Sequence, residues 1–466
     1  MTVCDSSGLP GIRLEVDSIS ESRPDGELSF RAQAGEIAAD FNVGADVTEA
    51  IELTANRGLA SVGYQLGGKG FVLTPEQLAK LNSVKVRSAD IVRSLVSARD
   101  LTQTSRGLLA INVSGCALPK LENELPAIFQ VLRNRVDPER RENPRASYRE
   151  RWWGYGEARL PYRPGLKGLR CPICTPITAK HRTFMFVPSD AICDSSTVMV
   201  AMDTGWALGV LSSRIHTAWA LRSGGRMGVG NDPRYLKKMC FDTFPFPAKK
   251  EGSLNVIGER IDAHRKQQQA AFPELTITGM YNVLEKLRSG EALTAKDKVI
   301  HEQGLVSVLK KLHDDLDAAV FDAYGWPHDL SDEQILESLV ALNAERAAEE
   351  RRGLIRWLRP EFQNPTGAKA ATQAKLTTTE EPDDSTVATP AIATAWPKKL
   401  AEQIAAVRDL LTKGAAEWTK AEGAAAFKGA NKADVEEVLD SLAALGILAA
   451  YDSRGTRRWK STRAAA

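Results

Sequence analysis

Apolar and polar residues recur with two different periods in the central part of the chain. Three runs between residues 171 and 202, CPICTPI, RTFMFVP and STVMVAM, are mostly apolar or alternate with polar positions, which is typical of strands. Residues 208–223 instead place Leu211, Ile215 and Trp219 four apart, which predicts one helix with an apolar face. Strands and helices mixed in this way predict an α+β fold for the main body of the chain.

Capping and breaking residues predict further element boundaries. Thr74 followed by Pro75 favours a helix start, and the helical spacing over residues 117–136 is interrupted at Pro126. The segment SDEQ at residues 331–334 fits the capping box of a long helix. The alternating run IRLEV near the N-terminus predicts a strand.

These patterns, together with shifts in composition, divide the chain into five expected segments. Residues 366–395 contain 8 Thr and 8 Ala among acids and prolines, too few large apolar residues to pack, which predicts a flexible linker. The segment after it shows helices followed by a strand, a turn and a basic strand. The expected segments are 1–55, an acidic remnant of the end of a larger domain; 56–250, the α+β body; 251–365, a helical domain; 366–395, the linker; and 396–466, a small winged-helix-like module.

Charge is segregated along the chain, although the formal net charge is only +2. Residues 140–182 carry 11 Lys or Arg against 3 acids, and residues 212–250 carry 8 against 2. Such blocks are typical of a surface that binds phosphate, the alternative being a solvated face covered by acidic neighbours. No window approaches the roughly 18 apolar residues of a membrane span. No signal-peptide pattern begins the chain, and its six scattered cysteines favour reduced thiols, so we expect a cytoplasmic protein.

The two basic blocks supply the candidate binding residues, and we expect them to form one continuous face. In residues 143–153 (NPRASYRERWW), arginines suit phosphate or guanine, while Tyr148, Trp152 and Trp153 either stack on nucleic acid or belong to the core. In residues 224–238 (GGRMGVGNDPRYLKK), Arg suits guanine, Asn suits adenine, Asp suits the cytosine amino group, and Gly permits close backbone approach. The predicted DNA contacts are Arg145, Arg149, Arg151, Arg226, Asn231, Asp232, Arg234, Lys237 and Lys238, the two lysines being assigned to phosphate.

Other residues that often carry chemistry are better explained structurally. Cys171 and Cys174 form a lone CxxC, whereas a zinc site needs four ligands. His216 lies at no spacing that defines a catalytic triad, and we interpret it as structural. His313, in the acidic run HDDLD, is interpreted as part of a solvated helix face, and the phenylalanines of TFPFP at residues 243–247 as core anchors. We therefore predict no catalytic and no metal-binding residue in this chain.

Five separated segments carry a recognisable pattern in a fixed order. They are NRGLASVGYQLGGKGFVLTPEQ (56–77), ADIVRSLVSARDLTQ (89–103), RENPRASYRERWWGYGEAR (141–159), CTPITAKHRTFMFV (174–187) and the run from LGVLSSRIHTAWALRSGGRMGVGNDPRY to FDTFPFP (208–247). Together they resemble the target-recognition region of MmeI-like type II restriction–modification enzymes. The helical run FDAYGWPHDLSDEQILESLVALNAERAAEE resembles the C-terminal helical region of the same family, so the resemblance covers about residues 56–363.

The resemblance implies a role and also a division of labour. In this family one polypeptide joins an endonuclease, a helical connector, an S-adenosylmethionine-dependent adenine-N6 methyltransferase and the recognition domain, and the target adenine is flipped out of the duplex. This sequence contains no Asn/Asp-Pro-Pro-Tyr/Phe tetrapeptide, no glycine-rich donor-binding motif in its required setting and no PD…ExK nuclease pattern. Residues 1–55 resemble only the closing strands of the methyltransferase domain. The resemblance thus implies double-stranded DNA as a partner and no cofactor bound by this chain. S-adenosylmethionine would belong to a catalytic subunit or to a missing N-terminal half.

From these observations we expect the DNA sequence-recognition portion of an adenine-specific methyltransferase in restriction–modification or phage defence. The chain is expected to be inactive in methyl transfer on its own. Two alternatives stay open: a complete DNA methyltransferase whose donor site is unrecognised, and a non-enzymatic DNA-binding regulator that relies on residues 396–466.

Overall fold

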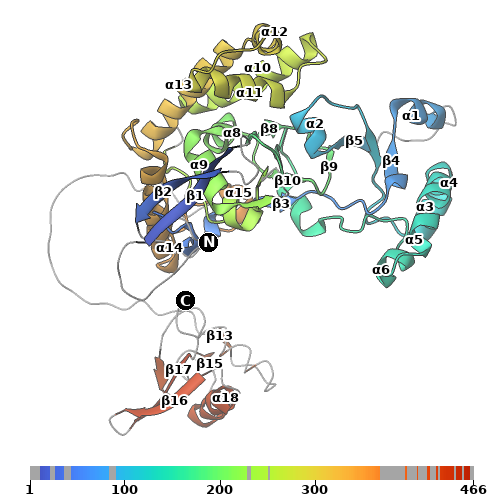
Figure 1. Cartoon of the computed structure of the whole chain (residues 1–466). Coiled ribbons are helices and arrows are strands. Elements are labelled where there is room, and N and C mark those ends of the chain that lie inside the picture. The colour runs from blue at the N-terminus through green and yellow to red at the C-terminus, as the bar shows by residue number, and fades with distance from the viewer. Residues whose placement is uncertain are drawn as a thin grey trace. The chain divides into compact units, whose positions relative to one another are not determined.

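A computed structural model gives the architecture of the chain, which forms two compact units, residues 1–373 and 374–466 (Figure 1). The predicted linker and the first part of the module predicted at residues 396–466 lie largely outside the described residues. None of the described helices is long and apolar enough to cross a membrane. The structure describes residues 11–20, 27–35, 43–82, 91–227, 232–249, 252–367, 394–395, 403, 407, 417–419, 427–428, 431–444, 448–453 and 456–461.

The first unit contains an N-terminal hairpin and two four-stranded sheets. The hairpin pairs β1 (Gly11–Ser20) with β2 (Glu27–Gly35), and β1 contains the predicted strand IRLEV. One sheet has the order β3 (Ala60–Val62), β10 (Thr197–Val200), β7 (Ile173–Pro176), β8 (Met185–Phe186), all antiparallel. The other has the order β4 (Val72–Leu73), β6 (Leu109–Ile111), β5 (Val92–Val96), β9 (Ile192–Cys193), with β5 and β9 parallel.

The three apolar runs predicted as strands become β7, β8 and β10. Every residue of β7 and β10 is buried, which explains why these strands are nearly continuous apolar runs. With helices packed beside these sheets, the predicted α+β fold is confirmed.

The predicted single helix over residues 208–223 is wrong in one respect. Two helices cover this segment, α8 (Gly205–Ser212) and α9 (Arg214–Ser223). Between them Ser213 takes an extended conformation, and its side chain accepts a hydrogen bond from the main-chain N–H of His216 at 3.3 Å. A serine that caps a new helix interrupts the old one, although the apolar spacing continues across the break.

Helix α8 is buried on all sides, and α10 (Gly252–Ala271) crosses it closely. A Cβ atom added at Gly258 would lie only 2.0 Å from the carbonyl oxygen of Gly205. Glycine at both positions therefore lets the two helix backbones approach, which packs the helical region directly against the sheet-containing region.

Most of the remaining helices of the first unit lie in two groups on either side of the sheets, and the two short helices at residues 98–102 and 360–363 lie beside the strands (Figure 1). Pro126 separates two helices as expected, and Ser331 and Gln334 form the predicted capping box, with bonds of 3.2 and 2.8 Å. Thr74 accepts from Gln77 at the start of the first helix. The bounds are α1 (Pro75–Asn82), α2 (Ala98–Thr102), α3 (Leu118–Glu124), α4 (Pro126–Arg135), α5 (Asp137–Arg141), α6 (Ala146–Glu150) and α7 (Arg163–Leu166), then α11 (Ile277–Ser289), α12 (Ala295–Gly304), α13 (Val306–Tyr324), α14 (Asp332–Arg351) and α15 (Pro360–Gln363).

The second unit has a small core of its own. Its centre is Trp459, which is fully buried and donates from its indole N–H to Asp440 at 3.0 Å. The described part places a helix before a β-hairpin, the order expected for this module. The elements are β13 (Thr394–Ala395), β14 (Glu417–Thr419), β15 (Phe427–Lys428), α18 (Lys432–Ala444), β16 (Leu448–Ser453) and β17 (Thr456–Ser461), with sheet orders β13-β15 and β14-β17-β16.

Candidate nucleic-acid interface

The second basic block forms a small antiparallel hairpin of β11 (Gly225–Met227) and β12 (Asp232–Arg234). The hairpin follows α9 directly, and Gly224 makes the junction. A Cβ atom at Gly224 would lie 2.3 Å from the carbonyl oxygen of Arg234. Glycine is therefore needed where the two strands of the hairpin leave the body of the unit.

A buried arginine, which the sequence analysis did not single out, holds this hairpin in place. The guanidinium of Arg182 donates to the Thr175 hydroxyl at 3.2 Å, to the Pro176 carbonyl, and to the carbonyls of Ile177 and Pro233 at 3.5 and 3.3 Å. Burial lowers the pKa of Arg182 to about 10, so the side chain stays charged at neutral pH. One side chain thus joins the end of β7 to β12. Its signal in the sequence is an arginine that begins an otherwise apolar strand-like run.

Helix α9 closes the other side of the hairpin base with buried aromatic contacts. His216 is fully buried, and its Nε2 lies 3.0 Å from the hydroxyl oxygen of Tyr235, the residue after β12. Its ring meets Phe244 edge-on, with centroids 4.3 Å apart. Burial, with the Arg182 charge nearby, lowers the pKa of His216 to about 3, so the imidazole is neutral. The structural interpretation of His216 is confirmed.

The segment after the hairpin is fixed through its main-chain carbonyls. The amide of Asn56 donates to the carbonyls of Phe241, Asp242 and Phe244 at 2.8, 3.2 and 2.8 Å. Asn343 of α14 donates to a further carbonyl of the same segment at 2.6 Å. Phe244 is fully buried, which confirms that TFPFP anchors the core.

The predicted contact residues of the hairpin differ in their exposure. Arg226 and Asp232 are exposed on neighbouring strands. Arg234 is half-buried, and its Nε atom is buried without a hydrogen-bond partner among the described residues. Asn231 lies outside the described residues. Arg226 and Asp232 are therefore the members of the predicted set that this hairpin presents to solvent.

The two lysines assigned to phosphate lie on η6, a π-helical turn (Lys237–Phe241). The ammonium of Lys237 already pairs with the buried carboxylate of Asp242. Burial raises the pKa of Asp242, and the Lys237 charge opposes that effect. Lys238 is exposed and lies 3.9 Å from a carboxylate oxygen of Glu52. Phosphate contact stays a prediction for both lysines, and Lys238 is the more accessible of the two.

The three predicted contact arginines of the first basic block lie in or next to helix α6: Arg145 precedes it, Arg149 lies within it and Arg151 follows it. Arg145 lies over the ring of Tyr148, 5.8 Å from its centroid, and Arg149 donates to the carbonyls of Asn143 and Pro144 at 2.6 and 3.1 Å. Arg151 is exposed, and no described residue pairs with its guanidinium. The DNA contacts of these three arginines stay predictions. Figure 1 shows α6 well apart from α9, and the expected continuous face formed by the two basic blocks stays a prediction.

The aromatic residues of the first block belong mainly to the core. Tyr148 is buried beneath the guanidinium of Arg140, 4.3 Å from the ring centroid. Trp152 packs on Phe129 with centroids 6.0 Å apart, and the indole N–H of Trp153 donates to a main-chain carbonyl at 2.9 Å. Tyr148 therefore packs within the protein, whereas Trp152 and Trp153 are half-buried and stacking on nucleic acid stays open for these two rings.

The cysteine pair shows no arrangement for a metal. Cys174 is buried and hydrogen-bonds to the thiol of Cys193, an interaction that, with burial, raises the pKa of Cys193. Cys171 is half-buried. The described residues contain no group of three or more His, Cys, Asp or Glu side chains placed to hold a metal ion.

The interpretation of His313 as part of a solvated face is wrong. His313 is buried, its Nε2 lies 2.8 Å from the hydroxyl oxygen of Tyr281, and burial lowers its pKa to about 3. Burial likewise raises the pKa of Asp317 to about 6. Asp314 and Asp315 are exposed and pair with lysines one turn earlier. The acidic run therefore straddles the core-facing and solvent-facing sides of α13.

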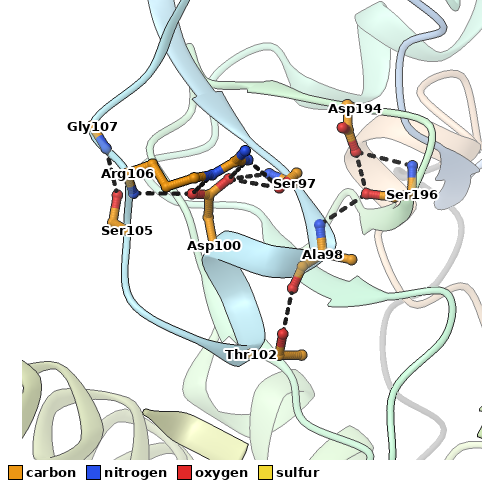
Figure 2. A network of polar contacts seen from close by, with 9 residues as sticks. All are labelled: Ser97, Ala98, Asp100, Thr102, Ser105, Arg106, Gly107, Asp194 and Ser196. Carbon is orange, nitrogen blue, oxygen red and sulfur yellow. Dashed lines mark hydrogen bonds and ion pairs between the residues drawn. The ribbon is translucent and has the colours of Figure 1, made fainter. Parts of the chain in front are cut away.

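A polar network organises the loop after β5 (Figure 2). The carboxylate of Asp100 accepts from Arg106 Nε and Nη2 at 3.0 and 2.8 Å, and from the main-chain N–H and hydroxyl of Ser97 at 3.0 and 2.7 Å. The main-chain N–H of Ala98 donates to the hydroxyl of Ser196 at 2.8 Å. This network joins α2 to the turn before β10. Its sequence signal, Ser-x-x-Asp before a short helix, is a capping box that the sequence analysis missed.

Comparison with known proteins agrees with this architecture. Residues 60–248 match the family model described as the MmeI target recognition domain. The fold is similar to that of the Type IIL restriction-modification enzyme MmeI, solved in complex with DNA, with a TM-score of 0.54 and 16% sequence identity. That likeness covers 73% of this chain, and the chain spans 42% of the length of the MmeI chain it matches. No curated protein matches the chain in sequence.

The sheets, the helices α8 and α9, the anchored hairpin and TFPFP all fall within or at the border of residues 60–248. The resemblance inferred from the five sequence segments is therefore confirmed. This chain carries a region similar to the target recognition domain of MmeI, followed by helices within the same compact unit.

Proposed function

We propose that this chain is the DNA sequence-recognition portion of a restriction–modification enzyme. More specifically, we assign it to an S-adenosylmethionine-dependent adenine-N6 DNA methyltransferase whose methyl-transfer chemistry resides in another segment or subunit. The observation that carries the proposal is the match of residues 60–248 to the MmeI target recognition domain. Double-stranded DNA is the partner, and the methyl donor binds the catalytic part rather than this chain.

The anchored hairpin supports the proposal in physical terms. Reading a base edge requires a side chain held at a fixed place, because a misplaced donor or acceptor forms no hydrogen bond. Arg182 and Tyr235 fix the base of the hairpin, while Arg226 and Asp232 are exposed on its strands. A guanidinium suits guanine and a carboxylate suits the amino group of cytosine.

The proposal is tested by DNA binding of the purified chain. A preferred duplex is first selected from a random pool, and binding is then followed by fluorescence anisotropy across a salt series. Affinity should fall steeply with salt, by about one unit of log–log slope for each phosphate neutralised. Arg226→Ala should relax base preference, whereas Lys238→Ala should weaken all duplexes similarly and lower the slope by about one. Absence of DNA binding, or uniform weakening by both variants, would contradict the proposal.

Two further measurements separate the proposal from its alternatives. Transfer of labelled methyl groups to DNA by the purified chain alone would show that the chemistry resides here after all. Removal of residues 396–466 tests whether the C-terminal module is the main binder, because its hairpin ends in the basic strand TRRWKS. If all DNA affinity disappeared with that module, the regulator alternative would replace the proposed function.

A further inference from the structure

A cavity of about 610 Å³ lies within the region matched to the target recognition domain, away from the hairpin. The loop 113–117 after β6 and the segment 151–161 after α6 form its walls. This volume falls in the range of pockets that enclose small organic ligands.

The charged groups around the cavity favour an anion. Arg151 and Arg159 both line it, whereas Glu157 is the one carboxylate among its lining residues. Glu157 is already paired, because its carboxylate lies 2.5 Å from the Arg159 guanidinium. Arg151 is exposed and has no partner among the described side chains. The net charge of the lining is therefore positive, and a guanidinium without a partner is suited to a phosphate.

The uncharged part of the lining suits a flat ring. Trp153 lines the cavity, and its indole is held in place by the 2.9 Å bond from Nε1 to the carbonyl of Cys116. Gly115 and Gly154 also line it, and a Cβ atom at either position would meet nothing closer than 3.6 Å, so the main chain is open to close approach there. Aromatic side chains that are fixed in this way stack on nucleobases without requiring a particular base.

Two buried polar atoms at the cavity lack a partner. The hydroxyls of Ser114 and Tyr155, both on residues that line the cavity, form no hydrogen bond within the described part of the chain. Tyr155 is 9% exposed. Buried hydroxyls are normally hydrogen-bonded, but neither of these two oxygens is accessible to solvent, so they belong to the wall of the cavity and do not face its space. Arg159, which lines the cavity, has a φ of 48°, a strained left-handed conformation of the kind found at ligand clamps.

We propose that this cavity binds a nucleotide, with the phosphate at Arg151 and the base beside Trp153. The inference rests on the proposed function for one of its two sources, an unpaired nucleotide displaced from bound DNA. The other source, a free nucleotide, offers the same chemistry and would make the cavity an effector site. A nucleotide from either source would bind through its base and its phosphate at the same time.

The experiment uses the full chain and two labelled duplexes that differ only by a one-nucleotide bulge. Binding is followed by anisotropy at fixed salt, and free deoxynucleoside monophosphates and inorganic phosphate are titrated separately. Ala117→Trp fills the cavity from an exposed lining position, and Arg151→Ala removes the free charge without breaking a contact. Arg260→Ala is the matched control, because Arg260 is exposed on α10 and has no partner among the described side chains. Thermal melting checks that each variant is folded.

We expect the bulged duplex to bind about tenfold more tightly than the paired one, as the stacking of one base would produce. This advantage should be lost in Ala117→Trp and Arg151→Ala but kept in Arg260→Ala. Saturable binding of free monophosphates that Ala117→Trp abolishes would identify a free nucleotide as the source. Equal binding of both duplexes together with no monophosphate binding overturns the proposal, as does competition by phosphate alone at the same concentration. If the paired duplex still binds in that case, the proposed function stands although the cavity proposal fails.

Discussion

The contacts of Arg182 predict a large loss of stability when its guanidinium is removed. Arg182→Met keeps the length and apolar stem of the side chain but deletes its hydrogen bonds to Thr175, Pro176, Ile177 and Pro233. Because several of these four hydrogen bonds are long, we count them as two good charge-assisted bonds. Two such bonds stabilise the folded state by roughly 3–6 kcal/mol. Relief of the buried charge offsets about half of that amount. We therefore expect the free energy of unfolding to fall by about 2 kcal/mol.

Urea denaturation followed by tryptophan fluorescence measures this loss. For an m-value of about 3 kcal/mol/M, the midpoint should move by about 0.7 M. Arg182→Lys keeps the charge but has fewer and less directed hydrogen-bond donors. Its free energy of unfolding should therefore fall by less than that of Arg182→Met. Arg260→Met is the control, since an exposed arginine on α10 without a described partner should change stability by no more than about 0.5 kcal/mol. The reasoning is refuted if Arg182→Met unfolds at the wild-type midpoint, or if the Arg260 control loses as much.

Three further predictions concern helix packing and the dependence of stability on pH. Gly258→Ala should destabilise the first unit by about 2 kcal/mol or more, because the added Cβ meets a carbonyl 2.0 Å away; Gly252→Ala, with nothing within 4 Å, is the control in thermal melting. Burial alone would raise the pKa of Asp100, but hydrogen bonds from Arg106 and Ser97 outweigh burial and hold the pKa at about 2. The ionised carboxylate therefore stabilises the fold above pH 4, and this stabilisation is lost as the pH falls from 4 to 2. Urea titrations of Asp100→Asn should show a shallower pH dependence in that window, and an unchanged slope would contradict the assignment. Burial lowers the pKa of His216 to about 3, so between pH 6.5 and pH 3 this imidazole takes up a proton in the unfolded chain but not in the folded one. The free energy of unfolding should therefore fall as the pH decreases from 6.5 toward 3, and His216→Gln should reduce this fall.

Local signals in the sequence were sufficient for most elements of the fold. Pro126 splits a helix and Ser331 caps another because each acts on its own turn of the chain. The break at Ser213 was missed because the apolar spacing of α8 and α9 stays in phase across it. Periodicity reports which positions face the core, and a capping serine between two in-phase helices leaves that pattern unchanged.

The site was less accessible to sequence reasoning because its decisive contacts join distant segments. The bonds from Asn56 to Phe241 and Phe244 span more than 180 residues, and nothing in the neighbourhood of Asn56 marks it as buried. His313 was misjudged because the charged residues beside it dominate the local composition, although it lies on the core-facing side of its helix. Arg226 is exposed, as is usual for a charged residue in a glycine-rich turn, and its predicted contact with DNA stays a prediction.

The contacts that hold the hairpin also explain how its exposed side chains can vary. Arg182 bonds to the carbonyls of Pro176 and Pro233, and Asn56 bonds to carbonyls of the segment that follows. Every residue supplies a main-chain carbonyl whatever its side chain, so these bonds do not depend on the identity of the exposed residues. A change at Arg226 or Asp232 therefore alters the groups offered to a partner while the anchoring bonds stay intact. The fold thereby separates the residues that position the hairpin from those that make its contacts.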